Sequence, residues 1–268
     1  MKPIFKYLCI PALITLPVSS ACADEVVELP NQRLMGSSYD YTGKDLVLKW
    51  EKGKTPTDGS PIRDAQVTAQ NITIEADFPD DYGGTLNKGI WSDHKTDITA
   101  PGNISVTTYD DGIYSSSSGG VTNIKGFKNL NITSRTGYGA VDNGNGINIK
   151  GESVEITSCE IRPAIGNSIW TRLFSHLGKG ITITADKIVL NSPQYSIFSG
   201  RGKDKKFEVT LDAQNIDITG TIFGYNGDII ITPRTEGEVN ISAPAQGEDS
   251  ISLEAGSRLT AELKKMQI

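Results

Sequence analysis

A short phrase recurs along this chain and limits what the chain can fold into. It consists of a small residue, Ile or a substitute for it, an aromatic residue and a small polar residue, as in Gly89-Ile90-Trp91-Ser92. The seven copies place the Ile-equivalent residue at Ile90, Ile113, Ala140, Ile169, Ile197, Ile222 and Ile251. Successive copies are 23 to 29 residues apart, a period typical of units that stack into a solenoid. The repeat therefore predicts one elongated domain.

Between the copies, apolar residues come in pairs separated by one polar residue. Ile147/Ile149 and Ile188/Leu190 are examples. The two members of such a pair lie on one face of a β-strand, and the Thr, Ser, Asn or Asp between them lies on the other. The spacing of an amphipathic helix is not sustained anywhere. We therefore predict an all-β fold of about seven turns, with three strands in each turn.

The first 23 residues have the pattern of a secretory signal peptide. A positively charged start containing Lys2 and Lys6 precedes an apolar stretch, and Ala21-Cys22-Ala23 forms an A-x-A cleavage site. The sequence thus predicts cleavage after Ala23, with Ala21 and Ala23 as the recognised residues. The exported protein is then secreted or lies at the cell surface of a bacterium of the Gram-negative type.

Removal of the signal peptide changes both the charge and the cysteine content. It leaves 24 Lys and Arg against 32 acidic residues, a formal net charge of −8. This charge argues against nucleic acid as a partner. It also leaves Cys159 as the single cysteine, so the sequence predicts no intramolecular disulfide.

The repeat divides the rest of the chain into three parts. Residues 24–62 depart from the repeat and are expected to form an N-terminal cap over the first turn. Residues 63–256 carry the repeat, and residues 257–268 form either an incomplete last turn or a C-terminal cap, for which a short helix is one form.

Four turns have Asn before the third strand, at positions 71, 103, 129 and 215. Asn suits a sharp corner because it tolerates a left-handed backbone. The sequence leaves open whether these amides form a hydrogen-bonded ladder or are solvated turn residues.

The pattern over residues 64–255 resembles the passenger region of bacterial autotransporter adhesins. Gly-Ile-Trp-Ser at 89–92 and Gln-Asn-Ile-Asp-Ile-Thr-Gly at 214–220, after a signal peptide, carry the likeness. It implies a right-handed parallel β-helix of the pectin-lyase-like superfold, and an adhesin or a surface-display module at the outer membrane. The C-terminal translocator barrel of that family has no counterpart in these 268 residues.

The same superfold also carries polysaccharide lyases and hydrolases. Trp91-Ser92-Asp93-His94 resembles the Trp-x-Asp-His phrase of pectate lyases, but Ile-Trp recurs at 169–170 without Asp-His. Acidic pairs occur at Asp80-Asp81 and Asp110-Asp111, and turn acids are a more usual interpretation of them than catalytic acids. The two histidines, His94 and His176, are far apart and have no metal-ligand pattern. We therefore assign no catalytic residue, metal ligand or cofactor.

The aromatic residues of the phrase, Trp91, Tyr114, Trp170, Phe198 and Phe223, share one side of their strands. If Ile faces the core, the aromatics form an outer row that suits a sugar chain or a partner. If the aromatics face the core, they are packing residues. The inward arrangement is favoured, because exposed aromatic stripes are unusual.

These observations lead to an adhesin-like module without catalysis, whose partner is a glycan or protein of a host surface and which is expected to be a monomer. A lyase or hydrolase acting in a groove on the rim is the alternative. A truncated passenger with no independent role is a further one.

Overall fold

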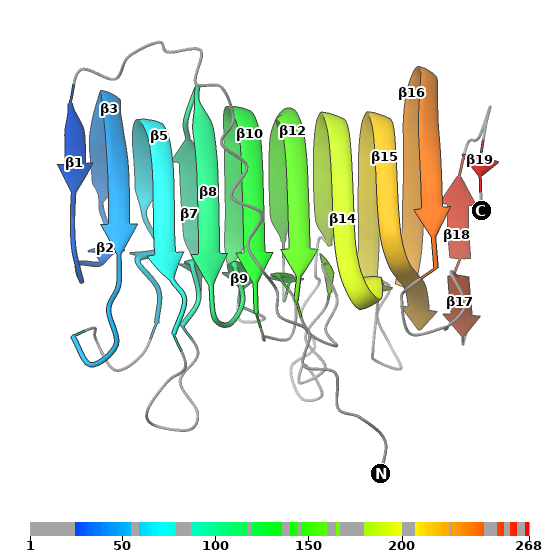
Figure 1. Ribbon diagram of the computed structural model, residues 1–268, viewed down its shortest axis with the longest axis horizontal. Coiled ribbons are helices and arrows are strands. Elements are labelled where there is room, and N and C mark those ends of the chain that lie inside the picture. The colour runs from blue at the N-terminus through cyan, green and yellow to red at the C-terminus, as the bar shows by residue number, and fades with distance from the viewer. Residues whose placement is uncertain are drawn as a thin grey trace.

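The protein consists of parallel β-strands stacked side by side along one long axis, as the computed structural model in Figure 1 shows. The structure describes residues 25–54, 59–78, 87–116, 119–135, 140–143, 146–159, 165–166, 180–199, 207–225, 227–243, 251–254, 258–261 and 266–267. Within these ranges there is no helix, and every strand pairing is parallel. The predicted all-β fold of stacked turns is confirmed.

The strands fall into three rows, one for each side of a turn. The first row contains β2 (Leu34–Met35), β4 (Ile62–Arg63), β6 (Ile90–Ser92), β9 (Ile113–Ser115), β11 (Val141–Asn143), β13 (Ile165–Gly166) and β17 (Ile251–Glu254). The other two rows are formed by β1 (Val26–Glu28), β3 (Ser38–Lys49), β5 (Gln66–Ala76), β7 (Lys95–Thr99), β8 (Asn103–Thr108), β10 (Val121–Ser134), β12 (Ile147–Ser158), β18 (Arg258–Ala261) and β19 (Met266–Gln267). Three long strands, β14 (Ile181–Ser199), β15 (Phe207–Tyr225) and β16 (Gly227–Ser242), bend around corners and serve more than one row.

The Ile of the recurring phrase lies in the core, one residue per turn. Ile90 pairs with Ile113, and both side chains are fully buried. The register corrects two copies: Val141, not Ala140, pairs with Ile113, and Ile165, not Ile169, pairs with Ile197. Ile169 lies outside the described residues. Loops of unequal length separate the copies, so spacing alone places these residues only approximately.

The small residues that flank Ile are required by the corners. A Cβ atom on Gly89 would collide with Cγ1 of Val106 and with the carbonyl oxygen of Gly112 one turn further on. At the other end of the phrase, Ser92 and Ser115 are fully buried, and Ser115 donates to the carbonyl oxygen of Gly120 at 2.5 Å. A bulky residue at either place would push the turns apart.

The apolar pairs form continuous stacks inside the solenoid. The third-row stack contains Leu46, Ile72, Ile104, Leu130, Val154, Ile188, Ile216 and Val239, all at most 1% exposed. Each such side chain contributes about 1.5–3 kcal/mol when it is fully buried. These stacks are the core of the solenoid.

The strand region begins and ends differently from the expected boundaries. Strand β1 pairs with β3, and β3 pairs with β5 in the same register as later turns. Residues 26–49, assigned above to a cap, therefore continue the parallel sheet. At the other end, β18 pairs with β16, and β19 does so too, so these segments are strands and not the helix considered for residues 257–267.

Cys159 is disulfide-bonded in the full chain, whereas the prediction of no intramolecular disulfide concerns the chain after cleavage and stays a prediction. The prediction assumed removal of residues 1–23, which contain the two other cysteines, Cys9 and Cys22. The bonding partner lies outside the described residues.

The asparagines before the third strand form a ladder. The amide of Asn71 donates to the carboxylate of Asp45 at 2.7 Å, its own oxygen accepts from the backbone N–H of Asn103 at 2.6 Å, and Asn129 donates to the side chain of Asn103 at 2.8 Å. Asn215 lies between Lys187 and Glu238 in the same row, where no neighbouring amide continues the pattern. The ladder alternative thus holds for the first turns.

A second ladder runs along the second row. Asn123 donates to Asp97 at 2.8 Å, and Asn148 donates to Asn123 at 2.9 Å. Both ladders begin with an aspartate on the N-terminal side, because the first member needs only to accept.

Candidate functional site

The outer side of the first row brings Arg63, Trp91, Tyr114 and Asp142 onto four adjacent turns. Arg63 pairs with Trp91, Trp91 with Tyr114, and Tyr114 with Asp142. Because the alternate residues Ile90 and Ile113 lie in the core, the aromatic side chains point away from it. Trp91 and Tyr114 are partly exposed.

This orientation overturns the favoured inward arrangement for Trp91 and Tyr114. Phe223 is also partly exposed, opposite the buried Ile222, and its ring lies 5.8 Å from that of Tyr195. The side chains of Trp170 and Phe198 lie outside the described residues.

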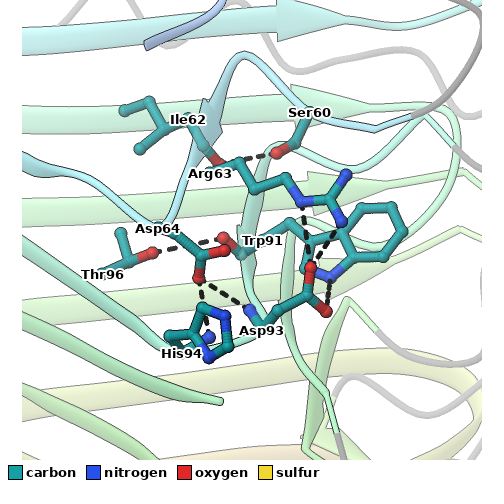
Figure 2. A network of polar contacts seen from close by, with 8 residues as sticks. All are labelled: Ser60, Ile62, Arg63, Asp64, Trp91, Asp93, His94 and Thr96. Carbon is teal, nitrogen blue, oxygen red and sulfur yellow. Dashed lines mark hydrogen bonds and ion pairs between the residues drawn. The ribbon is translucent and has the colours of Figure 1, made fainter. Parts of the chain in front are cut away.

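Arg63, Trp91 and Asp93 form one unit at this surface, shown in Figure 2. The Arg63 guanidinium donates through Nε and Nη2 to Oδ2 of Asp93 at 3.0 and 2.5 Å, and the Trp91 indole N–H donates to Oδ1 at 2.9 Å. The guanidinium carbon lies 4.3 Å from the Trp91 ring centroid, within the range of a cation–π contact. The side chains of Arg63 and Asp93 are 19% and 24% exposed.

The hydrogen bonds determine the charge state of Asp93. Partial burial by itself raises the pKa of this carboxyl group, but the hydrogen bonds from Arg63 and Trp91 and the guanidinium charge outweigh it and hold the pKa below its ordinary value. Asp93 is therefore a carboxylate at neutral pH.

A sharp turn holds the loop that carries Asp93. Oδ1 of Asp64 accepts from the backbone N–H groups of Asp93 and His94, each at 2.8 Å (Figure 2). Asp64 itself has φ of +48°, a left-handed conformation that Asp tolerates better than most residues. Thr96 donates to the carbonyl oxygen of Trp91 at 3.2 Å. The position of Asp93 is thus built into the backbone of two adjacent turns.

A buried charge cluster lies beside this unit. Lys88, 3% exposed, forms an ion pair with Asp111, which is fully buried, and its Nζ lies 3.6 Å from the Tyr114 ring centroid. Burial by itself lowers the pKa of Lys88, but the carboxylates of Asp111, Asp110 and Asp142 outweigh it and raise the pKa above its ordinary value. Lys88 therefore keeps its charge although it is out of water.

Tyr114 lies between the cluster and the exposed unit, because its ring is 5.5 Å from the Trp91 ring and has Lys88 over it. The pKa of the Tyr114 hydroxyl is raised, first by burial and then by the charges of Asp142, Asp111 and Asp93, against the opposing effect of Lys88. The phenol is therefore neutral at physiological pH, with carboxylates from three turns around it.

The structure brings together two acids that the sequence singled out, Asp93 and Asp111, around Tyr114. Asp110 and Asp111 are buried and are not solvated turn acids. His94 is exposed. Asp80, Asp81 and His176 lie outside the described residues.

Sequence reasoning did not find Arg63, Lys88 or Asp142. Pro61-Ile62-Arg63-Asp64 aligns with the recurring phrase as a copy without an aromatic residue, and this alignment would have placed Arg63 beside Trp91. Lys88 has no such signal, because it precedes the phrase in one turn only.

Among the described residues, no group of three or more His, Cys, Asp or Glu side chains has an arrangement that could hold a metal ion. The same residues include no helix with the length and apolarity of a membrane span. The chain matches no protein-family model, and comparisons with curated proteins and with solved structures also give no match.

Proposed function

We propose that this protein is an exported, adhesin-like β-solenoid that binds a polysaccharide or a glycan-bearing surface without cleaving it. The observation that carries the proposal is the outward position of Trp91, held beside Arg63 and Asp93 on adjacent turns. A partly exposed aromatic residue offers apolar area to the C–H groups of a sugar, and the neighbouring polar groups orient the sugar hydroxyls.

The finer architecture and the export route belong to the same proposal. We infer that the stacked turns form a right-handed parallel β-helix, because crossover connections between parallel strands are almost always right-handed. The signal-peptide pattern ending at Ala23 supports secretion. The resemblance to autotransporter passengers supports display at the cell surface, and the formal charge of −8 suits a soluble exported surface.

The charge states favour binding over glycoside hydrolysis. Hydrolysis requires a carboxylic acid that is protonated at neutral pH, with its pKa raised by its surroundings. The pKa of Asp93 is lowered, and its oxygens accept from Arg63 and Trp91. Asp111 is held by Lys88 away from solvent. Asp93 is therefore not prepared to protonate a leaving group, and Asp111 is not exposed to one.

A polysaccharide lyase or hydrolase is the second candidate, because one observation favours it. Acids and cations, Asp93 and Asp111 with Arg63 and Lys88, gather on adjacent turns of one side of the solenoid. Such a gathering is the usual composition of a catalytic groove.

Two assays on purified residues 24–268 separate these candidates. Retention is measured on immobilised neutral, amino and acidic polysaccharides, and the same polysaccharides are incubated with the protein, with and without calcium, and examined for new chain ends. Binding predicts retention with no new ends. New ends that disappear in Asp93→Asn or Asp111→Asn would replace the proposal with the enzyme.

The variant Trp91→Ala tests the site. It should lower retention at least about tenfold, the equivalent of about 1.4 kcal/mol. Tyr41→Ala is the matched control, because Tyr41 is another partly buried aromatic residue, located on β3 outside the first row. Equal retention by wild type and Trp91→Ala, with both folded by circular dichroism, would exclude this surface.

A further inference from the structure

The ion pair between Arg63 and Asp93 has a consequence for the class of glycan that this surface accepts. Acidic polysaccharides carry a carboxylate or sulfate on many of their sugars. Proteins bind such groups through exposed cations, most effectively through both edges of an Arg guanidinium. The question is therefore which cations near Trp91 present their charge to a ligand.

Arg63 does not present its charge freely. It directs Nε and Nη2 to Asp93, and its guanidinium carbon lies 4.3 Å from the Trp91 ring centroid. Lys88 is 3% exposed and is bound to Asp111. Lys95, on the following strand, is paired with Asp97 at 2.7 Å. The described cations around Trp91 are thus each matched to a carboxylate of the protein.

The described charged residues at and beneath this surface are negative in sum. Arg63 and Lys88 stand against Asp64, Asp93, Asp110, Asp111 and Asp142, which gives a formal charge of −3 for these seven residues. The whole chain has the same sign, with a formal net charge of −6. An acidic polymer approaching Trp91 is therefore repelled, most strongly at low ionic strength, where screening is weakest.

A neutral or amino sugar meets a different surface. Sugar C–H groups can contact the exposed part of Trp91, and an ammonium group is attracted by the negative field.

Resting on the proposed function, we propose that the Asp93 carboxylate makes this surface select neutral and amino polysaccharides and reject acidic ones. Asp93 does so by neutralising Arg63, the cation whose guanidinium carbon lies 4.3 Å from the Trp91 ring centroid. Asp93 is thus a specificity-determining residue.

The test compares retention of residues 24–268 on a neutral mannan, on chitosan and on polygalacturonate at low and moderate salt. Wild type should be retained on mannan or chitosan and not on polygalacturonate. Asp93→Asn keeps the side-chain shape and an oxygen for the Trp91 indole, but it releases the guanidinium. It should therefore gain at least about tenfold retention on polygalacturonate, and this gain should weaken as salt is raised.

Three controls keep the outcomes distinct. Arg63→Gln/Asp93→Asn should lose the gain, because the released cation is gone; it also removes the unpaired charge if Asp93→Asn alone folds poorly. Trp91→Ala has the charge of wild type, so chitosan retention that survives this change is unspecific attraction and counts against the proposal. Thermal unfolding of each variant verifies that it is folded.

Each result has one meaning. Retention of wild type on polygalacturonate alone, or no gain by a folded Asp93→Asn protein, overturns the selectivity and leaves the proposed binding function standing. No retention of wild type on any of the three polysaccharides overturns both.

Discussion

The Nζ atom of Lys88 lies 3.6 Å from the centroid of the Tyr114 ring while it is bonded to the carboxylate of Asp111. These residues belong to adjacent turns, so the ion pair crosses the boundary between them. Burying three carboxylates around one lysine costs free energy, because each charged group has lost its contacts with water. The stability of this part of the solenoid therefore depends on the one cation.

Removing that cation should be strongly destabilising. Lys88→Met leaves Asp111 buried without its partner, and we expect a loss of about 3–5 kcal/mol in the free energy of unfolding. Urea denaturation measures it. Lys88→Met/Asp111→Leu should be more stable than Lys88→Met alone, because no charge is stranded. The exposed pair Lys54–Glu51 is the control, and Lys54→Ala should leave the midpoint unchanged. A small effect of Lys88→Met would show that the cluster is solvated.

Stability should fall at alkaline pH. The folded-state pKa values of Lys88 and Tyr114 are both raised above their ordinary values of 10.5 and 10.0. The folded protein then holds protons that the unfolded chain releases, so their contribution is complete below about pH 10 and is lost as pH rises through the folded values. Urea midpoints at pH 8, 9, 10 and 11 measure the decline. Lys88→Met/Asp111→Leu should show a shallower decline, and an equal slope would contradict the assignment.

The residues of the amide ladder are not interchangeable, because Asn71 donates a hydrogen bond and Asp45 only accepts one. In Asn71→Asp, a carboxylate replaces the amide that donates to Asp45 at 2.7 Å. Two like charges would then face each other, and we expect a loss of about 1–3 kcal/mol, partly recovered at acidic pH where a carboxyl is protonated. Asp45→Asn retains an acceptor and should cost less. Urea denaturation of the two variants at pH 7 and pH 4 tests this order, and equal losses would refute the ladder.

Gly151 provides a test of the packing at a corner. A Cβ atom there would collide with three ring carbons of Phe127, one turn earlier, and Phe127 is 2% exposed. Because the ring has no space into which to move, Gly151→Ala should cost about 1–3 kcal/mol. Combining it with Phe127→Leu should recover part of the loss, as measured by thermal unfolding. If the losses of the two single variants simply add in the double variant, the collision with the Phe127 ring is not the cause of the loss.

The all-β stack of parallel turns could be predicted from the sequence because the period-two apolar pairs recur in every turn. Pairs such as Ile147/Ile149 and Ile181/Ile183 are in register in the structure. Exact register was harder to predict. Val141 and Ile165 occupy the register positions that the phrase assigned to Ala140 and Ile169, because loops of unequal length intervene.

The candidate site was less predictable. Ile and the aromatic residues alternate, so the pattern shows that they face opposite sides but not which set faces the core. The choice depends on the space at the corners. A Cβ atom at Gly89 or Gly112 would collide with a core side chain and with the backbone of the next turn, so these corners close tightly around an inner Ile. Lys88 could not be found, because its role arises from acids located 22, 23 and 54 residues away in the chain.

The division of each first-row strand into an inner and an outer residue has an evolutionary consequence. Ile62, Ile90 and Ile113 maintain the stack, while the residues after them, Arg63, Trp91 and Tyr114, are not needed to fill it. Mutations can therefore change the outer residues one turn at a time, while their separation stays at about 4.8 Å. Duplication of a whole turn would lengthen the outer row by one position. A lineage of such proteins can acquire new ligands by substitution and wider ligands by duplication, with the same core.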